Sequence, residues 1–171
     1  MPAPELSPVA ALVRRNDPDR FLTALFAPPD RREVLFTLYA FNHELARARE
    51  LVSQPTLGLI RLQWWREVVE GVPKQHEVAS PLGRALQAGL LPRAALLTMI
   101  AGREAEAEEA PPTAEAWLDY LESTAGAVAE AAGFALAGAA VPAARLRGLG
   151  TAYGVAGVLR GVAVLACLGR C

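Results

Sequence analysis

Prolines divide this sequence into helical segments, and their placement is the strongest constraint on its fold. Each of six prolines stands just ahead of, or at the start of, a helical pattern: Pro8, Pro18, Pro29, Pro81, Pro92 and Pro142. Proline fits the first turn of a helix, where its missing N–H costs nothing. Ser7, Asp17 and Ser80 directly precede three of these prolines, as N-capping residues do. Alternating Val/Ile/Thr runs and Asn-Gly hairpins are absent, so the sequence predicts an all-α protein.

The periodic segments between these signals predict eight helices in one domain spanning residues 1–171. We expect them near 8–15, 18–27, 29–52, 56–70, 81–90, 92–109, 114–139 and 142–168. The third segment carries an apolar stripe with steps of three and four that predicts one buried face: Val34, Leu38, Phe41, Leu45, Ala48 and Val52. The loops are short apart from 72–80 and 110–112. The last helix runs nearly to Cys171 without a clear stop signal, so we expect a C-terminally truncated fold.

The bulk composition is that of an ordinary globular domain. Hydrophobic residues make up 53% of the 171 residues, charged residues 20%, and the formal net charge is −1. The basic residues are scattered, which argues against a nucleic-acid partner. The Ala- and Gly-rich stretch at 125–144 is better explained by a buried helix hairpin than by a transmembrane span. No secretory signal is visible, so we expect a cytoplasmic protein.

Metal-binding patterns are weak. The two histidines, His43 and His76, have no second His or Cys at ligand spacing, so zinc is not expected. Magnesium needs converging carboxylates. The segment "REAEAEE" places Glu104 and Glu108 on one helix face, and a solvated helix end is the favoured interpretation. From Val141 onward the chain contains no Asp or Glu.

The segment "YAFNHELARARE", residues 39–50, concentrates polar groups on one helix. His43, Arg47 and Glu50 are neighbours at spacings of four and three, and Glu44 also reaches Arg47. They form either a surface charge ladder or the polar wall of a cavity, and spacing alone favours the ladder. Trp64 and Trp65 follow on the next predicted helix. Adjacent residues point about 100° apart, so we expect one tryptophan in the core and the other on a flank.

Several sequence blocks resemble the squalene/phytoene synthase family. They are "LYAFNHELARARE", "RLQWWREVVEG", "SPLGRAL", "MIAGREAE", "YLESTAG" and "LGTAYGVAGVLRGV", and they span about 19–170. The resemblance implies an isoprenoid-synthase helical bundle, of which this chain would be the N-terminal part. It also implies a central cavity in which two aspartate clusters hold Mg²⁺ against prenyl diphosphates.

The first aspartate cluster of that family is altered here. Against the pattern Tyr-Ala-x-Cys-Arg followed by Asp-Asp-x-x-Asp, Tyr39 is kept and His43 replaces the arginine. Ala46 and Arg47 replace the first two aspartates, and Glu50 replaces the last. A magnesium–diphosphate site needs several carboxylate oxygens, which Glu50 alone does not supply. The resemblance therefore implies a pocket without a metal.

The second cluster is altered further. The pattern Gln-x-x-Asn-x-x-Arg-Asp falls on Gly154, Gly157, Arg160 and Gly161, where only the arginine survives. Tyr120, in "YLESTAG", matches a tyrosine that the family places near the reacting carbons. By family match, Tyr39 and Tyr120 are the catalytic candidates. The ligand-pocket candidates are these two and the altered positions: His43, Ala46, Arg47, Glu50, Gly154, Gly157, Arg160 and Gly161.

The closer resemblance is to the non-synthase branch of the family, which includes the phytoene-synthase-like assembly factor of mitochondrial complex I and bacterial counterparts. "AFNHELA" in place of the aspartates and "GLIRLQWW" carry it. It implies a non-catalytic assembly or binding factor for a respiratory membrane complex, with respiratory subunits as partners and a peripheral place at the inner membrane. The alternatives are a divergent prenyl transferase, with Mg²⁺ as its cofactor, and a carrier of a prenyl or quinone-like lipid.

Overall fold

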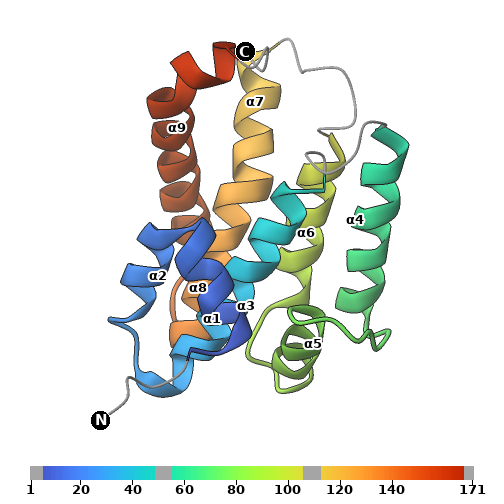
Figure 1. Cartoon of the computed structure of the whole chain (residues 1–171). Coiled ribbons are helices and arrows are strands. Elements are labelled where there is room, and N and C mark those ends of the chain that lie inside the picture. Colours follow the sequence, from blue (N-terminus) through green and yellow to red (C-terminus); the bar gives the residue numbers. More distant parts are fainter. Residues whose placement is uncertain (1–5, 49–54, 106–112, 168–171) are drawn as a thin grey trace.

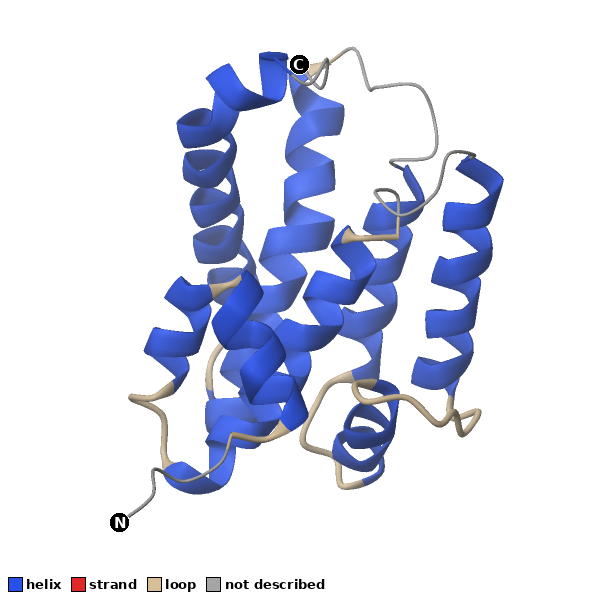
Figure 2. Cartoon of the chain, viewed as in Figure 1, coloured by secondary structure: helices blue, strands red, loops and turns tan. Residues whose placement is uncertain are grey.

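The computed structural model describes residues 6–48, 55–105 and 113–167, and all its regular elements there are helical (Figure 2). The α-helices are α1 (Pro8–Asn16), α2 (Pro18–Ala24), α3 (Pro29–Ala46), α4 (Pro55–Glu70), α5 (Ala79–Gln87), α6 (Arg93–Glu104), α7 (Ala114–Leu121), α8 (Ala127–Ala137) and α9 (Ala143–Cys167). A π-helical turn, η2 (Glu122–Gly126), joins α7 to α8, and a 3₁₀ turn, η3 (Gly138–Ala140), follows α8. The all-α prediction is confirmed.

Proline and capping signals place the first three helices correctly. Pro8, Pro18 and Pro29 each occupy the first turn of a helix. The Ser7 hydroxyl accepts a hydrogen bond from the backbone N–H of Ala10, and Asp17 accepts one from that of Arg20.

The prediction for Ser80 is wrong. Helix α5 already begins at Ala79, and its N-cap position is Val78, whose side chain makes no capping hydrogen bond. The Ser80 hydroxyl instead donates to the Lys74 carbonyl and accepts from the His76 backbone N–H. The serine therefore stabilises the preceding loop, because its own backbone is already helical.

Helix α3 runs through the middle of the molecule and is the centre of its core (Figure 1). It packs against α1, α2, α5, α6 and α8. The predicted stripe is confirmed from Val34 to Ala48, while Val52 lies outside the described residues. Leu35, Phe36 and Ala40 are buried as well, so α3 is enclosed on more sides than one stripe requires. Neighbouring helices approach it from several directions.

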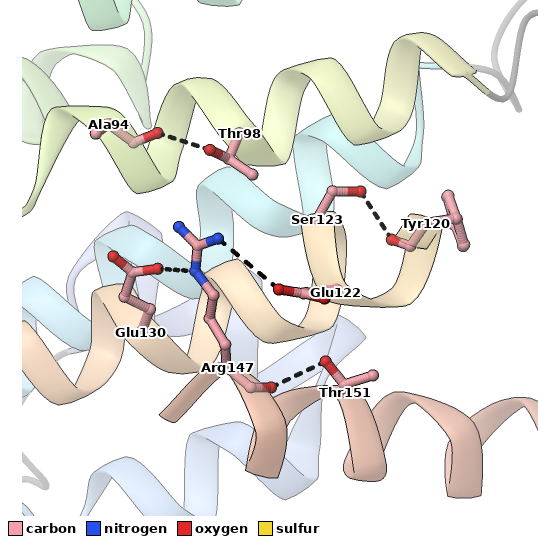
Figure 3. Close-up of polar contacts among 8 residues, drawn as sticks. All are labelled: Ala94, Thr98, Tyr120, Glu122, Ser123, Glu130, Arg147 and Thr151. Carbon is pink, nitrogen blue, oxygen red and sulfur yellow. Dashed lines mark hydrogen bonds and ion pairs between the residues drawn. The ribbon is translucent and has the colours of Figure 1, made fainter. Parts of the chain in front are cut away.

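Helices α7 and α8 form one rod that is interrupted by the π turn. The rod agrees, apart from this turn, with the single helix predicted at 114–139. The Ser123 hydroxyl donates to the Tyr120 carbonyl (Figure 3). The Thr124 hydroxyl donates to the same carbonyl, and the two bonds support the wider register of this turn. Gly138, with φ +59°, ends the rod. A side chain is strained in that conformation, and glycine is the common residue after a helix end.

Helix α9 packs against the rod at η2 and α8 through small residues. A Cβ atom added to Gly150 would lie 2.5 Å from the Ala125 carbonyl oxygen, 2.6 Å from the Ala129 Cβ and 2.9 Å from the Gly126 Cα. Two helix backbones therefore touch almost directly at this point. Near this point in the sequence of α9, Arg147 pairs with Glu130 and Glu122 on the rod (Figure 3). Within α9, the Thr151 hydroxyl donates to the Arg147 carbonyl.

This close approach predicts opposite effects for two glycines of α9. Gly150→Ala should lower the free energy of unfolding by about 1–3 kcal/mol, because the new methyl group meets backbone atoms that cannot move aside. Gly148→Ala is the matched control, since a Cβ there meets nothing within 4 Å. It should raise the free energy of unfolding by up to about 1 kcal/mol through helix propensity. Urea denaturation measures both, and equal stability of the two variants would refute the packing.

Candidate functional site

The C-terminal half of α3 carries a buried carboxylate held by two arginines. Glu44 is 3% exposed. Its Oε2 accepts a hydrogen bond of 2.6 Å from Arg61 of α4, and its Oε1 lies 3.5 Å from the Arg47 guanidinium. The predicted contact of Glu44 with Arg47 is therefore present, but it is no surface ladder. It belongs to an ion-pair cluster (Glu44, Arg47 and Arg61) in which the acid is buried and the two arginines are partly exposed, and which links α3 to α4.

Two buried donors beside this cluster are left without an acceptor in the part of the chain that the structure covers. They are the Nε of Arg61 and the indole nitrogen of Trp65, one turn apart on α4. Trp65 is 1% exposed and lies edge-on to Phe41, while Trp64 is only partly buried. The expectation of one core and one flanking tryptophan is confirmed.

Tyr39, the first catalytic candidate, is engaged in a stack that joins three helices. The Arg20 guanidinium of α2 lies 5.7 Å from the centre of the Tyr39 ring and 5.3 Å from that of Tyr153 on α9. Asp17 holds Arg20 from the other side through a 2.6 Å ion pair. Burial raises the pKa of Tyr39 above its usual value of 10.0, with Arg20 acting in the opposite direction. The phenol therefore stays neutral at physiological pH.

Tyr120, the second catalytic candidate, lies on α7 and contacts α6. Its hydroxyl accepts a hydrogen bond of 2.8 Å from Arg103, whose guanidinium also lies 5.8 Å from the ring centre. Both oxygens of Glu104, the next residue on α6, bind Arg66 of α4 at 2.7 and 2.8 Å. A single guanidinium nitrogen, Nη2 of Arg66, donates to both oxygens, so this carboxylate is engaged in an ion pair.

The remaining pocket candidates fall on the ends of α3 and along α9. His43 and Ala46 are half-buried on α3, and Glu50 lies outside the described residues. On α9, a Cβ atom on Gly154 would press against Ala125 of η2, while one on Gly157 would meet open space. Gly161 is half-buried and Arg160 is exposed. Their joint role as a ligand pocket stays a prediction.

The described residues do not bring together the carboxylates that a magnesium site would need. No group of three or more His, Cys, Asp or Glu side chains within metal-binding reach occurs among those residues. Glu106, Glu108 and Glu109 lie outside them, as does Cys171, and Cys167 is a free, exposed thiol. At the altered aspartate positions, Arg47 is a cation directed at Glu44. The polar groups described on this part of α3 thus form a guanidinium–carboxylate cluster instead of a set of metal ligands.

Sequence reasoning missed the partner that buries Glu44. Arg61 lies 17 residues away on a different helix. Spacing rules identify pairs within one helix, and no local signal shows which residue of another helix will face them. The stack of Arg20 between two tyrosines was missed for the same reason.

The cluster makes Glu44 the most sensitive acid of α3. Glu44→Gln should lower the free energy of unfolding by about 1–3 kcal/mol, because it removes the charge that compensates two guanidinium groups. Glu67→Gln is the matched control. Glu67 pairs with Lys74 at 2.9 Å but is 37% exposed, so the loss should stay below about 0.5 kcal/mol. Urea denaturation of both variants, with a double-mutant cycle to Arg61→Gln, tests this. Equal effects would contradict the cluster.

Comparison with known proteins agrees with the resemblance seen in the motifs. The family model for squalene/phytoene synthase matches residues 13–171. NADH dehydrogenase (ubiquinone) complex I, assembly factor 6, from Homo sapiens is 35% identical over 97 residues, which cover 54% of this chain and 29% of the human protein. The Mus musculus protein of that name is 31% identical over 122 residues, or 68% of this chain and 37% of its own.

The chain thus spans about a third of the length of these curated relatives. No solved structure matches it. The family match nevertheless extends over most of the sequence and includes the altered motif on α3 and the segment of α9. The helical fold and the motif order agree with that match, and the chain belongs to the squalene/phytoene synthase family.

Proposed function

We propose that this chain is a non-catalytic member of its family that serves as a binding or assembly factor for a respiratory membrane complex. The observation that carries the proposal is Arg47. It stands where the family resemblance expects a metal-binding aspartate, and its guanidinium is directed at the buried Glu44. A guanidinium at that position repels a divalent cation instead of binding it.

The relatives support the assembly half of the proposal. Proteins named complex I assembly factor 6 from human, cattle, rat and mouse are 31–36% identical to this chain over the matched segments. This similarity supports a respiratory complex as the proposed client, and a peripheral place at the membrane that holds the complex is part of the same proposal.

The prenyl transferase alternative needs a second source of carboxylates. Of the acids in the segment "REAEAEE", the described residues include Glu104. Both oxygens of the Glu104 carboxylate accept hydrogen bonds from Arg66. The transferase would have to break this ion pair before the carboxylate could reach a metal. The structure therefore favours the non-catalytic proposal over the transferase.

A turnover assay tests the non-catalytic half. We expect the purified full-length protein, mixed with Mg²⁺ and farnesyl or geranylgeranyl diphosphate, to release no diphosphate above the protein-free rate, because it lacks the ligands that would assist departure of the leaving group. An active squalene or phytoene synthase, assayed in parallel, is the positive control. Protein-dependent release of diphosphate would establish the transferase.

Deletion of the gene tests the assembly half. The amount of assembled NADH dehydrogenase complex on a native gel should fall, and the intact gene should restore it. A complex that is assembled to the normal amount without this protein would contradict the proposed role.

A further inference from the structure

We draw no further inference here: the strongest candidate, the pair of buried donors formed on α4 by the Nε of Arg61 and the indole nitrogen of Trp65, belongs to the site already described around Glu44, and nothing in the described residues shows what these two atoms bind.

Discussion

The enclosure of α3 is the constraint on which the rest of this structure depends. Five helices pack on it, and most of its residues from Val34 to Leu45 are buried. A polar side chain on such a helix must find a partner inside the protein, because burying an isolated charge is costly. Glu44 meets this requirement with Arg61 and Arg47, so the same cluster that satisfies a buried acid also ties α4 to the core.

This arrangement changes the electrostatics expected of the family's first aspartate motif. The resemblance implies carboxylates that hold a metal, whereas this chain presents Arg47 and an acid already committed to two guanidiniums. A metal site needs uncompensated carboxylates, whereas the ion-pair cluster on this part of α3 already compensates its buried acid with two arginines. At one altered motif position, Arg47 instead joins the ion pairs that link Glu44 of α3 to Arg61 of α4.

Near the C-terminal end of the described chain, small residues allow α9 to pack closely, and an ion pair adds to this packing. Gly150 lets α9 approach the π turn almost backbone to backbone, and Arg147 closes the same interface with Glu130. This packing uses one side of α9, while Tyr153 contacts Arg20 of α2 and Leu149 and Leu159 are exposed. A helix with apolar residues on both sides shows no amphipathic pattern, so the side that packs is known only from the structure.

The sequence by itself determined the all-α class, the helix starts at Pro8, Pro18 and Pro29, the buried stripe of α3 and the altered aspartate motif. These properties depend on residues within a turn or two of one another, where spacing and capping rules apply. Only the tertiary structure decided that Glu44 pairs with Arg61, that Arg20 contacts the rings of both Tyr39 and Tyr153, and which side of α9 packs against η2 and α8. Those contacts join residues of different helices, and their geometry arises only when the helices pack.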